Sequence, residues 1–215
     1  MIFTESYFSV VSLSLYVSLI AVILSMILSI LISSYLVINN FRGKSFILLV
    51  FSSMMSLPPV VVGLVLYILF SSSGIIGFMD LLYTPKIMIL AQLLITIPII
   101  ITLSYQVLSN LFMIYNQYLS SMHTSNVKVL YTLIVEGRND LLIIMLTGLG
   151  RALSEVGAVI IVGGNIAHNT RVMTTSIVLE TSRGDLNLAL SFGITLLVIA
   201  VSINIIIFLL KKRVN

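Results

Sequence analysis

Long stretches of this chain carry almost no charge, and they restrict its fold more than any other feature. A membrane-spanning helix needs about 20 consecutive apolar residues. Here 59% of the 215 residues are hydrophobic and only 8% are charged, whereas roughly a quarter are charged in soluble proteins. We therefore expect an all-α integral membrane protein that forms a single domain over residues 1–215. The five expected spans cover approximately residues 8–38, 46–70, 87–108, 141–162 and 186–210.

Several functional classes are excluded at this stage. The chain has no cysteine, which excludes disulfides and thiolate chemistry. Its net charge of +4 comes from basic residues scattered along the chain rather than from a basic stripe, so no nucleic-acid partner is expected. HExxH, GxSxG and Walker A motifs are missing, and we expect no catalytic residue. His123 and His168 fall on opposite sides of the predicted membrane, so no metal site is expected either.

The basic residues predict the orientation, because lysine and arginine prefer the cytoplasmic side of a membrane. With five spans, an outside N-terminus and a cytoplasmic C-terminus place seven basic residues inside and three outside, and leave Arg151 within the fourth span. The inside residues are Arg42, Lys44, Lys128, Arg138, Lys211, Lys212 and Arg213, and the outside residues are Lys86, Arg171 and Arg183. We expect a multi-pass protein of the cell membrane with its N-terminus outside. The first span lacks the basic start and the cleavage site of a signal peptide, so it should be retained.

Two of the connecting segments are too long for plain turns. The inside segment, about residues 109–140, has apolar residues at Val127, Leu130, Leu133 and Ile134, a helix-like spacing. Thr124, Ser125 and Asn126 are candidate N-caps for that helix. The outside segment, about residues 163–185, is rich in Thr, Asn and Arg side chains. We interpret it as an extracytoplasmic gate or vestibule.

Arg151 and Glu155 are the charged residues placed at membrane depth. An ionised side chain at the bilayer centre costs about 2.5 to 3.5 kcal/mol on insertion scales, so each needs a partner or a water-filled cavity. Their spacing of four residues puts them on one helical face, where they can pair. Two interpretations stay open: a structural ion pair that fixes helix packing, or a pair that lines or gates a polar pathway.

The sequence around that pair, GLGRALSEVGAVIIVGGN, is rich in small residues, which allow helices to approach closely in lipid. Gly163, Gly164 and Asn165 at its end also permit irregular backbone, which membranes tolerate where it is buried or lines a cavity. In the second span, Pro58 and Pro59 remove two backbone donors. These prolines predict either a simple kink or a gating hinge.

These motifs resemble the permease subunit of the tungstate-type oxyanion importers of the ATP-binding cassette (ABC) superfamily. The likeness covers about residues 45–205. It rests on GRALSEVGAVIIVGGNI (residues 150–166), TRVMTTSIVLET (170–181), LPPVVVGLVLY with SSSGIIG (57–77), and TPKIMILAQLLITIPIII (84–101). Molybdate and sulfate permeases have a similar Gly-Arg-Ala core, whereas the Val-Gly-Gly-Asn and Thr-Arg-Val-Met-Thr-Thr continuation favours the tungstate branch.

The resemblance implies a permease fold of the type I ABC importer kind, with a cytoplasmic coupling helix that docks on an ATPase. In this chain the matching residues are Met122, His123, Thr124 and Ser125, followed by Glu136 and Gly137, with a histidine at the family's usual glycine. It implies a homodimer of permeases, two ATPase subunits that bind ATP and Mg²⁺, and an extracytoplasmic oxyanion-binding protein. The chain itself would need no cofactor.

An oxyanion pathway should offer hydroxyl, amide and guanidinium donors. Our outer candidates are Asn165, Thr170, Arg171, Thr174 and Thr175. Arg151 and Glu155 are candidates deeper in the membrane, although pairing with Glu155 would cancel the attraction of Arg151 for an anion.

Three alternatives stay open. A molybdate or sulfate permease would use the same machinery. An ion-coupled secondary transporter would commonly show internal repeats and intramembrane ion sites, and we find no repeat and one carboxylate at depth. A membrane subunit that does not transport would use the long inside segment only as a docking surface.

Overall fold

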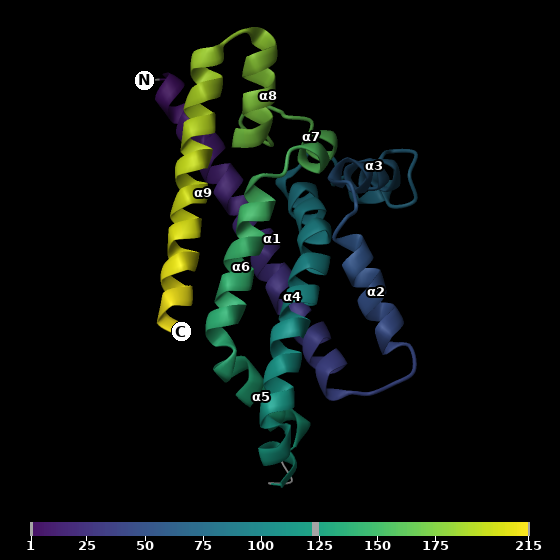
Figure 1. The fold of residues 1–215 in the computed structure, drawn as a ribbon. Helices are drawn as coiled ribbons and strands as arrows, with labels where there is room; N and C mark the ends of the chain where they lie inside the picture. Colours follow the sequence, from purple (N-terminus) through teal and green to yellow (C-terminus); the bar gives the residue numbers. More distant parts are fainter. Residues whose placement is uncertain (1, 122–124, 215) are drawn as a thin grey trace.

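The computed structural model describes residues 2–121 and 125–214, and within these residues the regular elements are all helices (Figure 1). Met122, His123 and Thr124 lie outside the described residues. The helices, in chain order, are α1 (Ile2–Ile38), α2 (Lys44–Met54), α3 (Pro59–Phe70), the short 3-10 helix η1 (Gly77–Met79), α4 (Pro85–Ser121), α5 (Asn126–Glu136), α6 (Arg138–Leu153), α7 (Gly157–Gly163), α8 (Met173–Arg183) and α9 (Leu186–Val214). The α8 end and the α5 end lie at opposite ends of the bundle.

Three unbroken helices are long and apolar enough to cross a membrane: Tyr7–Ile38 of α1, Pro85–Tyr115 of α4 and Leu186–Lys212 of α9. Two further crossings are possible if each bent helix pair counts as one span. The pair α2 and α3 is bent by 99°, and the pair α6 and α7 is bent by 59°. The described chain therefore has three to five candidate spans, which fits the all-α membrane fold expected from the sequence.

The predicted span 46–70, in which Pro58 and Pro59 were expected to give a kink or a hinge, consists of two helices on either side of the prolines. Pro58 has extended backbone (φ −64°, ψ 122°) and Pro59 begins α3. A residue that precedes proline is disfavoured in the helical region, and neither proline can donate a backbone hydrogen bond. At 1.5 Å per residue, helices of 11 and 12 residues each reach about 18 Å, well short of the bilayer core of about 30 Å. The consecutive prolines thus separate two half-span helices rather than kink a single one.

Helix α4 is longer than the predicted third span, 87–108, and includes the first part of the segment expected at 109–140. Helix α4 runs through Pro98 and continues to Ser121. Pro98 removes one bond of the helix, the one that its N–H would donate to the Leu94 carbonyl, and the helix continues past it. The Thr102 hydroxyl donates to the Pro98 carbonyl at 2.8 Å. The predicted helix after Ser125 is present as α5, and Ser125 occupies its N-cap position without a side-chain capping bond.

Helices α1 and α4 form the centre of the bundle and pack along a row of serines. Ser33 Oγ donates to the Ile101 carbonyl at 3.1 Å, and Ser25 Oγ lies 2.6 Å from Thr96 Oγ1. The buried α1 serines are Ser14, Ser18, Ser25, Ser29, Ser33 and Ser34. Small side chains let two helices approach closely in lipid, and hydroxyl bonds to main-chain carbonyls satisfy the serines there.

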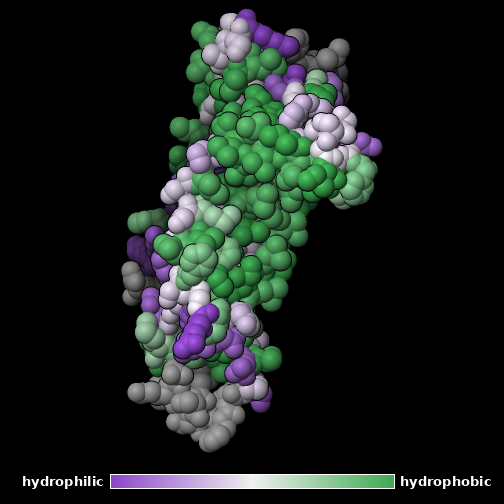
Figure 2. Space-filling view, turned by 90° about the vertical axis from the view of Figure 1, so that its right-hand side faces the viewer, coloured by the Kyte–Doolittle hydropathy of each residue, from purple (hydrophilic) through white to green (hydrophobic). Residues whose placement is uncertain are grey.

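The molecular surface has the polarity expected of a membrane protein. Figure 2 shows a broad hydrophobic band along one side of the bundle, with hydrophilic residues gathered toward both ends. Helix α9 contributes many exposed apolar side chains, among them Leu190, Ile194, Leu197 and Phe208. Such a surface is stable against lipid or a second membrane helix, not against water.

Candidate functional site

The fourth predicted span breaks at the charged pair. Arg151 lies in the last turn of α6, and Glu155 lies between α6 and α7. The expected pairing is present: Arg151 Nη2 lies 3.9 Å from Glu155 Oε2. This distance allows charge attraction but exceeds a hydrogen bond. The side chain of Glu155 is 6% exposed and that of Arg151 is 43% exposed, so the pair stands at the border of the protein interior.

At the break between α6 and α7, side chains of other helices form hydrogen bonds with main-chain carbonyl groups. Gln92 of α4 donates from Nε2 to the Ala152 carbonyl at 2.9 Å, and Thr174 of α8 donates from Oγ1 to the Glu155 carbonyl at 3.0 Å. The Glu155 carboxylate accepts the Ala158 N–H at 3.2 Å. The break is therefore a bonded junction of α4, α6, α7 and α8. Sequence reasoning missed Gln92, although a lone amide in an apolar span is a signal for such a bond.

Helix α3 of the first bent pair and helix α7 of the second contact each other. A Cβ atom added to Gly63 of α3 would lie 2.7 Å from the Ala158 Cα atom of α7. At the same contact, a Cβ atom on Gly157 would lie 2.5 Å from a methyl group of Val60. Real Cβ contacts do not reach such distances, so both positions need glycine for the helices to touch.

The loop after α7 turns on a left-handed pair, Gly164 (φ 68°) and Asn165 (φ 51°). A Cβ atom on Gly164 would lie 2.6 Å from the Tyr83 ring, and the Tyr83 N–H donates to the Val162 carbonyl at 2.9 Å. A hydrogen bond with Tyr67 raises the pKa of the Tyr83 phenol. The phenol is therefore neutral at physiological pH. The irregular backbone expected at the two glycines is present and packs on Tyr83.

The three outer threonines are buried and bonded to main-chain groups. Thr170 Oγ1 donates to the Gly163 carbonyl and accepts the Ile166 N–H at 2.9 Å. Thr175 Oγ1 accepts the Val172 N–H at 3.1 Å and so caps α8. Thr174 holds the Glu155 carbonyl, as described above. In this conformation their hydroxyls shape the loop and its junction with α7.

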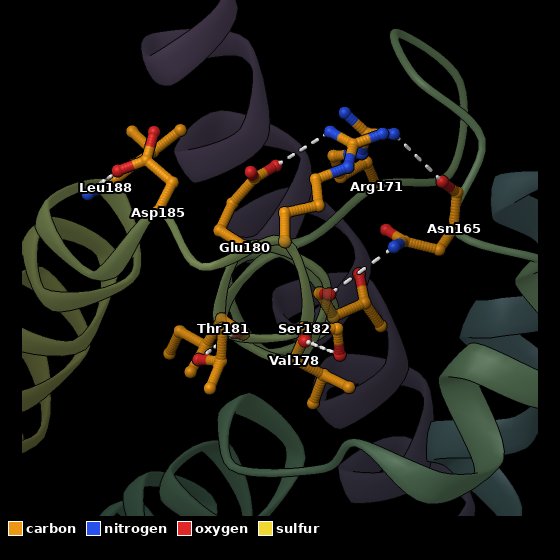
Figure 3. A network of polar contacts seen from close by, with 11 residues as sticks. Asn165, Arg171, Val178, Glu180, Thr181, Ser182, Asp185 and Leu188 are labelled. Atoms are coloured by element: carbon orange, nitrogen blue, oxygen red, sulfur yellow. Dashed lines mark hydrogen bonds and ion pairs between the residues drawn. The ribbon is translucent and has the colours of Figure 1, made fainter.

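Arg171 and Asn165 have bonding capacity left over (Figure 3). Arg171 Nη2 donates to the Asn165 carbonyl at 3.4 Å, and Asn165 Nδ2 donates to the Thr175 carbonyl at 3.4 Å. Arg171 Nε and Asn165 Oδ1 are buried and have no hydrogen-bond partner among the described residues. Buried polar atoms are rarely left unpaired, so these two mark a place where a further ligand or water would fit.

Arg171 also borders two cavities at the α8 end. The first, which we call the α1 hollow, encloses about 400 Å³. Its polar lining consists of Ser9, Ser12, Tyr16, His168 and Arg171, around an apolar floor of Val10 and Leu13. The second, the α8 chamber, encloses about 70 Å³. Its polar lining includes Arg171, Ser176 and Glu180.

At the α5 end, α5 buries one face and exposes the other. Val129 and Leu133 are buried, whereas Val127 and Tyr131 are 76% and 71% exposed. Val135 completes the exposed apolar ridge at the same helical spacing. At the C-terminal end of α5, Glu136 accepts the Tyr115 hydroxyl at 3.5 Å, and a Cβ atom on Gly137 would meet Leu111 at 2.9 Å. Met122, His123 and Thr124 belong to the part that is not described.

No cluster of three or more His, Asp or Glu residues that could hold a metal ion occurs in the described residues. His168 lies at the α8 end, in left-handed backbone (φ 62°). The buried groups without a hydrogen-bond partner at this end, among the described residues, are Arg171 Nε, the Ser176 hydroxyl and the acceptor Asn165 Oδ1.

Comparison with known proteins completes the description. No protein-family model matches the chain. It is 39% identical over 211 residues to the tungstate uptake system permease protein TupB of Peptoclostridium acidaminophilum, covering 98% of this chain and 92% of that protein. It is 38% identical over 173 residues to the TupB permease of Campylobacter jejuni, covering 80% and 72%. It is 34% identical over 201 residues to a probable anion ABC transporter permease protein of Haloferax volcanii, covering 91% and 87%.

Proposed function

Because the chain belongs to the ABC transporter permease family that includes the tungstate uptake permeases, we propose that it is the membrane subunit of an ATP-driven importer for tungstate. The observation that carries this proposal is identity along nearly the whole chain to a permease whose name states tungstate uptake. Molybdate and sulfate are the alternative cargoes, since the third relative is named only as an anion permease.

Energy input is required by the direction of transport that we propose. Moving charge across a membrane costs about 2.3 kcal/mol per elementary charge per 100 mV, so a dianion entering a negative-inside cell costs about 5 kcal/mol. A passive pore would release the anion instead of accumulating it. Within the proposed complex, ATP and Mg²⁺ bind to the ATPase subunits, and this chain supplies the membrane passage.

The exposed apolar ridge of α5 is the proposed docking surface for the ATPase. Val127, Tyr131 and Val135 are presented at the end of the bundle toward which the C-terminus of α9 also points. Lys211 and Lys212 near that C-terminus favour the cytoplasm for this end. The α8 end then faces the outside, where an oxyanion-binding protein would deliver its cargo.

The contact of α3 with α7 is the proposed gate. Both helices are short halves of bent pairs, and they touch through Gly63, Gly157 and Ala158. Helices α3 and α7 would tilt together when the ATPases close, because their backbones are in close contact and one helix cannot move toward the other alone. Arg151 and Glu155 mark one end of α7, and Asn165 and Arg171 lie beyond the other. All four are proposed to border the pathway, which a homodimer of this chain would complete.

Copurification tests the assembly. The chain should purify with an ABC ATPase in two-to-two stoichiometry, and calorimetry of the external binding protein should show a preference for tungstate. A clear preference for sulfate would overturn the cargo assignment. Anion uptake that persists without ATP and collapses with a protonophore would favour an ion-coupled secondary transporter instead.

A further inference from the structure

We propose that the α1 hollow binds a tetrahedral oxyanion, with Arg171 as its main contact and Glu180 as a built-in competitor. The polar lining of the hollow consists of one arginine, one histidine, two serines and one tyrosine, and its lining includes no carboxylate. The guanidinium donors of Arg171 match the oxygen atoms of an oxyanion, whereas the Ser12 hydroxyl already donates to the Phe8 carbonyl.

The bonding of Arg171 supports this assignment. A guanidinium carries five N–H donors in a fixed fork. The long bond to the Asn165 carbonyl uses one of them, while the buried Nε has no partner among the described residues. A carbonyl oxygen supplies no full negative charge, and no carboxylate forms an ion pair with Arg171 among the described residues, so this half-buried guanidinium has no counter-charge there. An anion in the hollow would supply it.

Glu180 lies on the other side of Arg171, across the α8 chamber. Its side chain is 9% exposed, and its ion-pair partner among the described residues is Arg183, with Nη1 at 3.3 Å from Oε1. Arg171, Glu180 and the unpartnered hydroxyl of Ser176 line the same chamber. Figure 3 draws both side chains, and their bonds lead to different partners, from Arg171 to Asn165 and from Arg183 to Glu180. The carboxylate attracts Arg171 away from the hollow and so weakens anion binding, which a transport site requires if the anion is to leave again.

The oxyanion has two possible sources with the same chemistry. One is the transported anion, and this reading rests on the proposed function. The other is the phosphate of a membrane lipid, because Ser9, Ser12 and Tyr16 lie in the first turns of the candidate span that begins at Tyr7. Basic and aromatic side chains are typical of that depth in a membrane.

The test uses the purified full chain in maltoside detergent free of phospholipid. In one arm, equilibrium dialysis against tungstate is followed by mass-spectrometric counting of bound tungsten. In the other arm, phosphatidylglycerol is added and retained lipid is counted by native mass spectrometry.

Arg171→Gln should lower binding at least about tenfold, the effect of losing a charge-assisted hydrogen bond. Glu180→Gln should raise it. Lys86→Gln removes an equal charge from an exposed position outside the hollow and should change nothing.

Tungstate retention that depends on Arg171 identifies the free anion as the ligand, and lipid retention that depends on Arg171 identifies the headgroup. Either result upholds the site. Binding that is undetectable in the wild type, or unchanged in Arg171→Gln, overturns it, and weaker binding in Glu180→Gln overturns the competitor role. If Arg171→Gln fails to fold, Arg171→Lys replaces it. This variant keeps the positive charge but loses the planar set of guanidinium donors, so it should bind the ligand with intermediate affinity.

The same experiment separates this site from the proposed function. ATP-driven tungstate uptake at the wild-type rate by an Arg171→Gln complex that no longer binds either ligand would leave the function standing and remove the hollow from the pathway. Lipid retention that depends on Arg171, in a complex that takes up no tungstate, would uphold the binding site in the hollow and overturn the proposed transport of tungstate.

Discussion

Gly63 of α3 lies so close to Ala158 of α7 that a methyl group on the glycine would stand 2.7 Å from the Ala158 Cα atom and 3.0 Å from its carbonyl oxygen. Both atoms belong to the main chain, so a side-chain rotation cannot relieve the overlap. The two bent helix pairs thus meet backbone to backbone. A movement of α7 at the Glu155 junction would have to move α3 as well.

Gly63→Ala should therefore lower the thermal stability of the purified chain, because overpacking a close contact costs about 1 to 3 kcal/mol. The matched control is Gly150→Ala on α6, where an added Cβ atom meets nothing within 4 Å. Alanine is a better helix former than glycine, so this control should leave the melting temperature unchanged or raise it. Equal losses in the two variants would contradict the close contact.

The ion pair at the α6–α7 break predicts an asymmetry between single and double variants. Arg151→Gln leaves the nearly buried Glu155 carboxylate without its charged partner, which is costly. Arg151→Gln combined with Glu155→Gln removes both charges, and the new amide oxygen can still accept the Ala158 N–H. Thermal unfolding should show the single variant to be the less stable. If the double variant loses at least as much, the pair does not stabilise this junction.

If the exposed ridge of α5 is the docking surface, a substitution there should weaken binding of the ATPase without unfolding the chain. Tyr131 is 71% exposed, so Tyr131→Ser should leave the free energy of unfolding of the isolated chain within about 0.5 kcal/mol of wild type. The same change should abolish copurification with the ATPase, because exposed aromatic side chains are common anchors of interfaces. The control is Thr132→Val, which lies one position off the ridge and should retain the ATPase. A Tyr131→Ser chain that still copurifies with its ATPase would exclude the ridge as the docking surface.

The sequence located the membrane-embedded segments because lipid imposes a simple rule, namely a long apolar run. It also predicted the Arg151–Glu155 pair, since a four-residue spacing and the cost of burial point to the same partner. The α6–α7 break had no comparable signal. Ser154, Glu155 and Val156 include neither proline nor glycine, and the junction depends on bonds from Gln92 and Thr174, which are distant in the sequence.

The double proline shows the opposite situation. Pro58 and Pro59 marked the position of the irregularity correctly, but local chemistry does not set a bend of 99°. It also gives no sign that α3 packs against α7, which is distant in the sequence. The burial of Glu180 was likewise hidden, because an acid near the end of the outer segment resembles an ordinary solvated charge. The buried α1 serines were within reach of sequence reasoning, since Ser14, Ser18, Ser25, Ser29 and Ser33 recur at helical spacing in an apolar run.

The natural absence of cysteine makes the orientation directly measurable. Ser72→Cys places one thiol on an exposed position between α3 and η1, and Asn126→Cys places one at the start of α5. A membrane-impermeant maleimide added to intact cells should label the first, and should label the second only after the membrane is permeabilised. Labelling of Asn126→Cys in intact cells would reverse the orientation and remove α5 from the cytoplasm.

The most direct test of the central claim is tungstate uptake by proteoliposomes that contain this chain, its ATPase and the external binding protein. We predict that tungstate accumulates inside when ATP and Mg²⁺ reach the ATPase, that accumulation is unaffected by a protonophore, and that it stops when α5 carries Tyr131→Ser. Accumulation without ATP, or ATP hydrolysis that drives no tungstate uptake, would contradict the account.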